Sequence, residues 1–513
     1  MMHEPTDHQV AVFAFLGDFM RHAGGDVKRI DTHASVIFLV GERAFKIKRA
    51  VRFPYLDYST LNKRREACLA ELEVNQAFAP QLYRRILPIT QNASGQLGLD
   101  GEGEPIEWAI EMRRFDENQT LDHLAAQQRI DDDLADKLAR AVAEMHTHAP
   151  PVEVESWLSA IEKFLNQNAS AFHQAPSLFP DEIAVALDRD SHAAFVRLRP
   201  LLVARGQRGL VRRNHGDLHL GNIALLEGHP TPFDAIEFDP MVAAGDVFYD
   251  LAFLLMDLIE RGLKGAANLI LNRYLVATRR MNGLDGLEAL PFFMSLRAAI
   301  RAKVLAAQMQ HVDDVARPSL AQTAKVYFDL AVRLLAPPPP ALIAIGGLSG
   351  TGKSTIARAL APDLAPEPGA VIVRSDVERK TLFGLAETAR LTPEAYRPEV
   401  NAAVYARLVS QAGQIIAAQH SVIVDAVFAN ADERVEIAEI ATKNEVSFHG
   451  IFLIADLKTR TARINTRKPN ASDADAKIVQ QQENYVLNHI DWVQIDASGS
   501  LEETLTKCRA ALG

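Results

Sequence analysis

Cysteine is scarce in this chain, and its scarcity narrows the classes of protein that the sequence can encode. The 513 residues include two cysteines, Cys68 and Cys508. A disulfide-stapled fold and a cysteine-rich zinc site are therefore excluded, and the composition fits a reducing cytoplasm. The first residues, Met1 to Pro5, lack the basic and apolar regions of a secretory signal, so we expect no export.

Long apolar runs and an excess of positive charge are also missing. No apolar run reaches about 18 residues, so we expect no transmembrane helix. Lys and Arg number 55 against 65 Asp and Glu, which gives a net charge of −10. A surface that mainly binds nucleic acid would be basic, so a small-molecule partner is favoured over nucleic acid. At this length we expect two or three globular domains.

One glycine-rich stretch has the pattern of a phosphate-binding loop. The pattern G-x-x-x-x-G-K-[ST] runs from Gly347 to Ser354, after an apolar run that predicts a buried strand at 341–345. Lys353 can reach the β- and γ-phosphates, and the Ser354 hydroxyl can hold Mg²⁺. The glycines let backbone N–H groups turn toward the phosphates. The predicted nucleotide-binding residues are Gly347, Leu348, Ser349, Gly350, Thr351, Gly352, Lys353, Ser354 and Thr355.

A run of four prolines, Pro337 to Pro340, lies directly before that strand. Such a run cannot continue a helix and stays extended and stiff. It predicts a domain boundary, with a first domain at 1–335 and a second at 341–513. The first domain is long enough for two lobes, a small lobe at about 1–112 and a helical large lobe at about 113–335.

The second domain alternates apolar strands with helices. The predicted strands are 341–345, 371–374, 421–425, 448–455 and 492–495. This alternation predicts a doubly wound parallel sheet with its site at the carboxyl ends of the strands. Asp425 ends a buried strand, as does the Walker-B acid that holds Mg²⁺ in nucleotide-binding proteins.

Three polar residues in the first domain have the order and spacing of a phosphoryl-transfer site. Asp217 and Asn222 lie five residues apart, and Asp234 follows Asp217 by 17 residues, after a predicted hairpin. One carboxylate must deprotonate an acceptor hydroxyl, while an amide and a second carboxylate hold Mg²⁺ on the triphosphate. The set therefore predicts a second ATP- and Mg²⁺-dependent site.

A basic stretch precedes these residues. Positions 43–65 hold eight Lys and Arg against one acid, Asp57. Two interpretations remain open: a solvated basic face, or a polyanion bound nearby.

The stretch His215-Gly216-Asp217-Leu218-His219-x-x-Asn222 resembles the catalytic loop of the aminoglycoside phosphotransferases and their relatives, including choline kinase. The resemblance implies a protein-kinase-like fold. It also implies that Asp217 is the catalytic base and that Asn222 and Asp234 bind Mg²⁺. The segment from Asp234 to Phe238 resembles the Asp-x-Glu-Phe variant of small-molecule kinases such as methylthioribose kinase, with one extra residue. Whether Glu237 or Asp239 shares the metal stays open.

The same family has a strand lysine that pairs with a helix glutamate at the phosphates. By position the lysine is Lys46, with Lys48 as the alternative, and the glutamate is Glu71, with Glu66 as the alternative. This sequence departs from the protein-kinase pattern because no G-x-G-x-x-G loop precedes Lys46. Residues 33–35 would have to cover the phosphates instead.

The second domain resembles P-loop kinases of small molecules, namely gluconate kinase, adenylylsulfate kinase and the zeta-toxin group. In those kinases an Asp-x-x-Arg after the second strand contacts the acceptor, which implies Asp376 and Arg379 here. The alternative for Asp376 is a helix N-cap.

Three arginines, Arg460, Arg463 and Arg467, lie on a short helical stretch before Pro469. One interpretation is a basic surface helix. The other is a lid that is mobile until it closes Arg463 and Arg467 onto the triphosphate as catalytic residues. The stretch has few acids within a turn, so we expect it to have little reason to pack down alone.

Nearly the whole chain resembles bacterial fusions of an aminoglycoside-phosphotransferase-like domain with an ATP-binding domain. We predict an ATP- and Mg²⁺-dependent phosphotransferase with two nucleotide sites and small-molecule hydroxyl acceptors. The alternatives are a regulatory ATPase whose first domain binds nucleotide without transfer, and a nucleic-acid or nucleotide-sugar kinase of the zeta-toxin type. The sequence names neither acceptor.

Overall fold

The computed structural model describes residues 7–22, 26–32, 34–53, 56–279, 281, 283–466, 472–473, 476–485, 487 and 489–513. By its internal contacts the chain forms two compact units. The first comprises Met1–Arg261 and Leu296–Ala331, and the second comprises Gly262–Ser295 and Val332–Gly513. The stretch Gly262–Ser295 therefore groups with the chain beyond the proline run, although it precedes that run in sequence.

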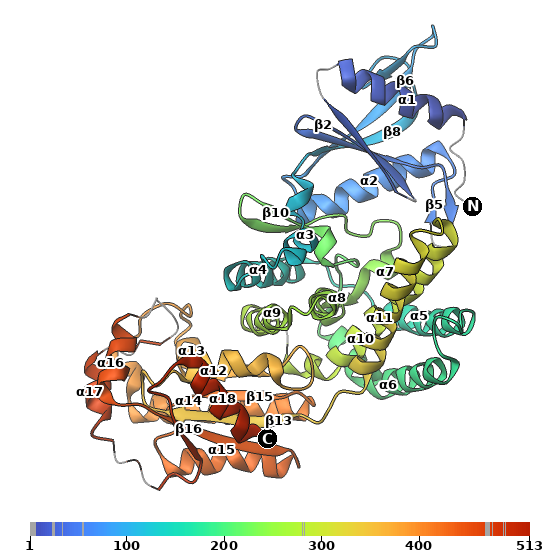
Figure 1. The fold of residues 1–513 in the computed structure, drawn as a ribbon. Coiled ribbons are helices and arrows are strands. Elements are labelled where there is room, and N and C mark those ends of the chain that lie inside the picture. The colour runs from blue at the N-terminus through green and yellow to red at the C-terminus, as the bar shows by residue number, and fades with distance from the viewer. Residues whose placement is uncertain are drawn as a thin grey trace. The chain divides into compact units, whose positions relative to one another are not determined.

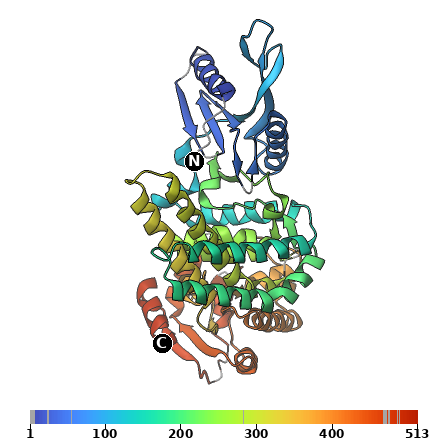
Figure 2. The ribbon, with the colours of Figure 1, turned by 90° about the vertical axis from the view of Figure 1, so that its right-hand side faces the viewer.

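The small lobe of the first unit is an antiparallel sheet with one helix on each face (Figure 1). Its strand order is β1-β2-β3-β8-β6-β7. The bounds are β1 Val27–Asp31, β2 Ser35–Val40, β3 Arg43–Lys48, β6 Tyr83–Gln91, β7 Leu97–Leu99 and β8 Glu104–Arg113. The helices are α1, Asp7–His22, and α2, Leu61–Phe78. Figure 2 gives a second view of this lobe, turned by 90°.

Side chains along β3 alternate between the two faces of the sheet. Phe45 and Ile47 pack into the apolar cluster under α1. Lys46 and Lys48 face the other way, toward α2, because side chains on a strand alternate with a period of two. One face of the strand therefore serves the core, and the other presents two lysines to a helix.

The large lobe of the first unit is helical. Its elements include α3 Leu121–Ala126, α4 Asp132–His148, α5 Val154–His173, α6 Asp181–Gln207, α7 Pro240–Ala243 and α8 Val247–Glu260, together with most of α10 Leu290–Gln308 and of α11 Arg317–Leu335. Two strand pairs accompany them, β9 Val211–Arg213 with β12 Ala244–Asp246, and β10 Ile223–Leu226 with β11 His229–Pro232. Helix α8 is the most apolar and is buried almost throughout, as expected for a central helix. Helices α3 and α8 and strand β12 contact the loop from Asn214 to Asn222.

The second unit contains a five-stranded sheet in which every pairing is parallel. The order is β14-β15-β13-β16-β17, with bounds β13 Ala341–Gly347, β14 Val371–Arg374, β15 Val422–Asp425, β16 Ser447–Ile454 and β17 Val493–Asp496. The predicted doubly wound parallel sheet is confirmed. The first strand of the domain, β13, lies at the centre of the sheet, so the loop that follows it emerges between neighbours.

The helices of the second unit are α9 Lys264–Ala277, α12 Lys353–Leu360, α13 Ser375–Leu382, α14 Pro398–Ala417, α15 Ala431–Lys443, α16 Leu457–Asn465, α17 Ala476–Gln482 and α18 Leu501–Leu512. The core beneath the phosphate loop joins strand residues such as Ile345 and Ile423 to Ile356 of α12 and Cys508 of α18. This packing fixes the start of α12 at the end of β13.

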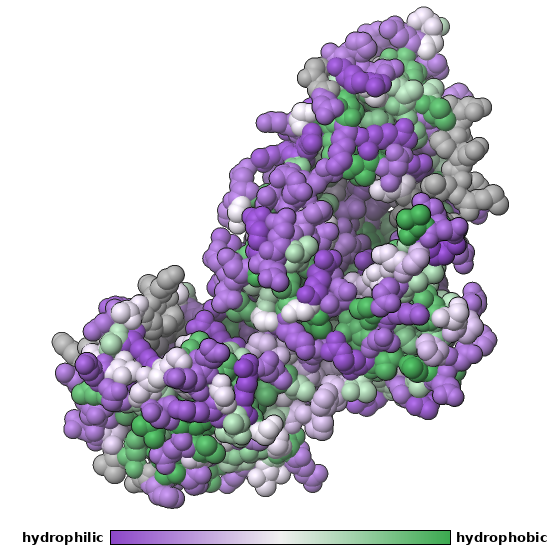
Figure 3. All heavy atoms as spheres, in the orientation of Figure 1, coloured by the Kyte–Doolittle hydropathy of each residue, from purple (hydrophilic) through white to green (hydrophobic). Residues whose placement is uncertain are grey.

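Among the described residues, no helix combines the length and the apolar character that crossing a bilayer requires. Hydrophilic side chains cover much of the face shown in Figure 3, in both units.

Candidate active sites

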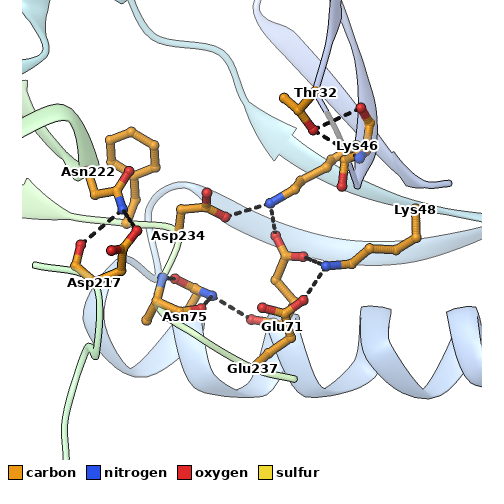
Figure 4. A network of polar contacts seen from close by, with 12 residues as sticks. Thr32, Lys46, Lys48, Glu71, Asn75, Asp217, Asn222, Asp234 and Glu237 are labelled. Carbon is orange, nitrogen blue, oxygen red and sulfur yellow. Dashed lines mark hydrogen bonds and ion pairs between the residues drawn. The ribbon is translucent and has the colours of Figure 1, made fainter. Parts of the chain in front are cut away.

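The first candidate site brings two strand lysines to one helix carboxylate. Lys46 Nζ lies 2.8 Å from Glu71 Oε1 and 2.5 Å from Asp234 Oδ1. Lys48 Nζ contacts the other Glu71 oxygen and also Glu237 Oε1. Figure 4 shows Lys46 reaching toward Asp234 and Glu71 together. The two lysines share one face of β3, so the choice between them is not exclusive: both bind Glu71.

Of the other carboxylates named from the sequence, Glu237 joins this cluster through Lys48, whereas Glu66 and Asp239 have other partners. Glu66 accepts a hydrogen bond from the Asn62 side chain, at 2.8 Å on the exposed side of α2. Glu237 accepts one from Tyr58, at 2.6 Å, besides its contact with Lys48. Asp239 Oδ1 accepts the backbone N–H of Met241, at 2.9 Å, beside the start of α7.

Strong charge coupling holds this cluster together. Glu71 is fully buried, and the Lys48 side chain is 3% exposed. Burial alone would lower the pKa of Lys46, but the charges of Asp234 and Glu71 outweigh it and hold that pKa well above its ordinary value. Desolvation would raise the pKa of Asp234, but the charge and hydrogen bond of Lys46 lower it. Lys46 and Asp234 therefore both stay ionised.

Asp217 and Asn222 form a hydrogen-bonded pair within one loop. Asn222 Nδ2 donates to Asp217 Oδ2, at 2.9 Å, and to the Asp217 carbonyl, at 3.0 Å. His219 Nε2 lies 3.4 Å from Asp217 Oδ2. Burial would raise the pKa of Asp217, but the hydrogen bond and charge of His219 lower it well below its ordinary value. The carboxylate is thus ionised, the state that a proton acceptor needs before transfer.

Buried groups to which the sequence assigned no role hold this loop in place. Gly216 has φ +82°, and a Cβ there would lie 3.1 Å from Ala243 Cα, so glycine is required. Asp250 Oδ1 accepts the Gly216 N–H, at 2.9 Å, and Arg297 Nη1 donates to the Gly216 carbonyl, at 3.0 Å. His146 Nε2 lies 3.1 Å from Asp250 Oδ2. A buried His or Arg inside a helix gives no local signal, and so both were missed.

The donor set of this site fits a hard divalent cation. Asn222 gives its amide N–H to Asp217, and among the hydrogen bonds of the described residues none ends on Asn222 Oδ1. Asp234, 44% exposed, lies near enough to Asp217 for the charge of Asp217 to raise its pKa. Asp234 also has φ +61°, a conformation often found at functional positions. Carboxylate and amide oxygens are the ligands that Mg²⁺ takes in proteins.

In the part of the chain that the structure describes, no group of three or more His, Cys, Asp and Glu is placed to hold a metal by itself. Mg²⁺ usually completes its coordination with waters and substrate phosphates. The Asp and Asn oxygens of this site suit an ion that arrives with a nucleotide rather than one that stays permanently bound.

The second candidate site lies on the loop after β13. Gly347, Gly350 and Gly352 have φ of +135°, +87° and +98°. A Cβ on Gly350 would lie 2.7 Å from the Arg460 carbonyl oxygen, and one on Gly347 would lie 2.5 Å from the Leu453 carbonyl oxygen. Gly347 and Gly350 are therefore closed to other residues for reasons of both conformation and space, and Gly352 for reasons of conformation alone.

The polar end of this loop meets the end of β15. Ser354 Oγ donates to Asp425 Oδ2 at 2.5 Å. Arg374 Nε lies 3.2 Å from the same carboxylate oxygen, and Arg374 Nη2 donates to Ser354 Oγ at 3.0 Å. Lys353 Nζ donates to the Leu348 carbonyl at 3.2 Å, and burial lowers the pKa of Lys353. A hydroxyl and a carboxylate oxygen side by side also fit Mg²⁺.

These groups line a cavity of about 980 Å³ that continues past the loop to Asp376 and Arg379. Burial raises the pKa of Asp376. The N-cap of α13 is Arg374, and no side chain caps the helix, so the alternative interpretation of Asp376 as an N-cap is wrong. Arg379 Nη1 donates to the Ala395 carbonyl at 2.7 Å, and its guanidinium lies 4.9 Å from the ring centre of Tyr396.

One arginine of α16, Arg460, differs from the expectation. Arg460 is buried: Nε donates to the Ser349 carbonyl at 3.0 Å, Nη2 donates to the Val479 carbonyl at 3.3 Å, and Nη1 pairs with Glu483. The expectation that this stretch has little reason to pack down alone is wrong at Arg460, because the acid that pairs with it comes from beyond the helix.

Of the two arginines predicted to be catalytic, only Arg463 lies within the described residues. Arg463 lines the cavity and donates to the Thr351 carbonyl at 3.3 Å and to the Gly499 carbonyl at 2.9 Å. Arg467 lies outside the described residues, as does His33 of the predicted phosphate cover in the first site.

Comparison with family models identifies both domains. Residues 37–288 match the phosphotransferase enzyme family, and residues 342–487 match a family described as AAA domain. The chain therefore carries a kinase-like phosphotransferase domain followed by a P-loop kinase-like domain, and the protein is an enzyme of the kinase class. Kinase families of this kind use ATP, normally with Mg²⁺.

Relatives of nearly full length come from mycobacteria. Uncharacterized proteins of Mycobacterium tuberculosis and Mycobacterium bovis are 27% identical over 489 residues, which is 93% of this chain and 93% of each relative. An alignment of this length spans both domains of this chain.

Several solved structures are similar to one part of the chain. A gluconokinase from Sinorhizobium meliloti is 21% identical, with a TM-score of 0.25, over 34% of this chain and 91% of its own. An amicoumacin kinase is 14% identical, with a TM-score of 0.37, over 63% and 96%. A choline/ethanolamine kinase family protein from Mesorhizobium loti is 12% identical, with a TM-score of 0.35, over 64% and 99%. At these TM-scores no function is carried over to this chain.

Proposed function

From a phosphotransferase domain at 37–288 and a P-loop domain at 342–487, we propose a phosphotransferase with two nucleotide sites. Each site binds Mg²⁺ and ATP and passes the γ-phosphate to a hydroxyl of a small molecule. One observation supports this most: each unit places a lysine in the same cluster as oxygen donors that suit Mg²⁺. These are Lys46 beside Asp234 in the first unit, and Lys353 with the Ser354–Asp425 pair in the second.

In the first site, Glu71 holds Lys46 where its ammonium can bind phosphate oxygens. Asn222 and Asp234 would hold Mg²⁺, which neutralises charge on the phosphates. Asp217 accepts the proton of the acceptor hydroxyl as its oxygen bonds to the γ-phosphorus. The bond between the γ-phosphorus and the bridging oxygen breaks, and ADP leaves.

In the second site, the loop from Gly347 to Thr355 binds the phosphates through backbone N–H groups and Lys353. Ser354 and Asp425 would hold Mg²⁺. Asp376 and Arg379, farther along the same cavity, bind the acceptor. Arg463 and Arg467 act as the catalytic arginines of a lid formed by 456–473.

The location and the partners follow from charge and composition. Cys68 and Cys508 are buried free thiols, which fits the cytoplasm that we propose as the site of action. The acidic net charge of −10 favours small-molecule acceptors over nucleic acid.

Binding stoichiometry on the full chain tests the two-site proposal. Calorimetric titration with Mg²⁺ and AMP-PNP should give two nucleotides per chain, and Lys46→Ala or Lys353→Ala should each remove one. Lys137→Ala and Lys443→Ala are matched controls, since both lysines lie exposed on helices and pair with an acid four residues away. A wild-type stoichiometry of one would overturn the proposal.

Transfer itself is tested with γ-labelled ATP and a small-molecule extract. Label should appear on one or more acceptors. Asp217→Asn should abolish labelling of the acceptor of the first site, and Lys353→Ala should abolish labelling of the acceptor of the second site. Release of labelled inorganic phosphate alone would favour the regulatory ATPase instead. Labelling of nucleic acid or of a nucleotide sugar would favour a kinase of the zeta-toxin type.

A further inference from the structure

Arg374 lies at the point of the second site where nucleotide and acceptor would meet. Its guanidinium touches Asp425, at 3.2 Å, and Ser354, at 3.0 Å. Its charge also acts on Asp376, whose pKa it lowers against the larger effect of burial. Arg374 thus contacts both proposed metal ligands and lines the same cavity as the proposed acceptor residue Asp376.

Glu387 forms a second ion pair with the Arg374 guanidinium. Arg374 Nη1 lies 3.8 Å from Glu387 Oε1, and the other Glu387 oxygen accepts a hydrogen bond from Arg273 Nη1 at 2.7 Å. The three side chains are mostly buried, at 14%, 19% and 27% exposed. Glu387 does not line the cavity that Arg374 lines, so its role there is to orient Arg374 rather than to touch a ligand.

Arg273 belongs to α9, a helix that lies within the stretch matching the phosphotransferase family but belongs to the second compact unit. Helix α9 covers the edge of the second sheet. Asn268 Nδ2 and Asn272 Nδ2 donate to the Ala370 carbonyl, at 3.0 and 3.2 Å, and Asn272 Oδ1 accepts the Ile372 N–H at 2.7 Å. Since β14 is an edge strand, these side chains satisfy backbone groups that the sheet leaves unpaired.

We propose that Arg374 is a catalytic residue of the second site and that Arg273 is a positioning residue that holds it through Glu387. The inference rests on the proposed function of this site. An arginine fork binds phosphate oxygens in pairs and suits the charge that spreads over a transferring phosphoryl group.

In the transfer step, the acceptor oxygen bonds to the γ-phosphorus, and the hydroxyl proton passes to Asp376. The bond to the bridging oxygen breaks, and its electron pair leaves with ADP. Arg374 donates hydrogen bonds to the equatorial oxygens throughout, and forms no covalent bond. Its contribution should therefore be greater in the transition state than with bound ATP.

The test uses two probes that need no knowledge of the acceptor. In full-length chains that carry Lys46→Ala, only the second site should bind nucleotide. Calorimetry then compares Mg²⁺ with AMP-PNP, which resembles bound ATP, against Mg²⁺ with ADP and aluminium fluoride, which resembles the transferring phosphoryl group. The variants are Arg374→Ala, Arg374→Lys, Arg273→Ala and Lys264→Ala. Lys264 is the matched control, because it lies on the same helix and pairs with Glu367, at 3.1 Å, outside the cavity.

We expect Arg374→Ala to weaken binding of the aluminium fluoride complex by about 10²-fold or more, while AMP-PNP affinity changes by no more than about threefold. Arg374→Lys keeps the charge without the fork and should lose part of that difference. Arg273→Ala should weaken the same complex by about tenfold, and Lys264→Ala should leave it unchanged. The double variant of Arg273 and Arg374 should be no worse than Arg374→Ala alone, because both act through one group.

Equal weakening of both probes by Arg374→Ala would reduce Arg374 to a structural ion pair, and additive losses in the double variant would remove Arg273 from the proposal. If the parent chain binds neither probe and Lys353→Ala changes nothing, the proposed function of this site fails, and the inference fails with it. Unchanged binding of both probes in Arg374→Ala, with a normal loss in Lys353→Ala, overturns the inference alone.

Discussion

The two sites hold their lysines by opposite means. In the first unit, Lys46 is held by side-chain carboxylates from other elements, one 25 residues away and one 188 residues away. In the second unit, Lys353 is held by the backbone of its own loop, at Leu348, five residues away. The first site is assembled by tertiary contacts between charges, and the second is mostly local.

The electrostatics differ in the same sense. Although burial opposes it, the pKa of Lys46 rises because two carboxylates surround it, whereas burial prevails at Lys353 and lowers its pKa. A buried ion pair is costly to break but adds little over an apolar replacement. We therefore expect the first site to respond strongly to loss of a partner charge, and the second to respond to loop geometry.

The largest expected effect lies in the chemistry of the first site alone. Asp217→Asn removes the proton acceptor, so first-site transfer should fall by ~10²–10⁴ with ATP affinity nearly unchanged. Asp234→Asn should instead weaken binding of Mg²⁺ and ATP, and second-site binding should be normal in both chains. Transfer rates and calorimetry on the full chain measure this. Exchanged phenotypes would mean that the roles of the two acids are reversed.

Loss of the shared carboxylate tests the charge-held architecture. Glu71→Gln leaves Lys46 and Lys48 with fewer compensating charges in a buried place, and should lower the free energy of unfolding of the first unit by about 3–5 kcal/mol. Urea unfolding measures it. Glu66→Gln is the matched control, since Glu66 lies exposed on the same helix. Equal stability of the two variants would contradict the comparison between the sites.

The second site should be most sensitive to changes in the backbone geometry of its loop. Gly350→Ala forces a side chain to φ +87° and to 2.7 Å from the Arg460 carbonyl oxygen. The substitution should cost about 3 kcal/mol of free energy, which weakens nucleotide binding at the second site and lowers the stability of the loop. Gly413→Ala is the control, because it lies in α14 with its nearest neighbour at 3.8 Å. Normal AMP-PNP affinity in Gly350→Ala would show a loop that tolerates distortion.

The smallest expected effect is a loss of stability of the second unit at acidic pH. Burial lowers the pKa of His420 to about 4, and its Nε2 lies 3.0 Å from the Gly369 carbonyl oxygen. Because the folded pKa is below the unfolded value of about 6.5, the unfolded chain binds the proton more readily. The free energy of unfolding is highest above about pH 6.5 and falls as the pH drops toward 4, with a loss of about 2 kcal/mol at pH 5.

Hydrogen exchange of the β15 amides at pH 7 and pH 5 measures this loss, and His420→Gln should abolish it. In the first unit, burial likewise lowers the pKa of His215, so the same comparison on that unit shows whether acid sensitivity is shared. A pH response that persists in His420→Gln would assign it to other groups of the second unit.

Local patterns in the sequence were enough to predict the loop that forms the centre of each site. The glycine loop before Lys353 and the Asp217-x₄-Asn222 spacing are short-range features, since their geometry depends on backbone conformation within a few residues. The alternation of apolar strands and helices likewise predicted the parallel sheet, because burial of both sheet faces demands it. The catalytic and binding roles of the individual side chains remain predictions.

Tertiary structure alone decided which remote charges meet. Lys48 joins Lys46 on Glu71, Arg460 is buried against Ser349, and Arg273 reaches Glu387 from a position 114 residues earlier in the chain. No periodicity or motif carries this information. The distances between such groups are fixed only when helices and sheets pack, and in those buried places a charge without a partner would be too costly to keep.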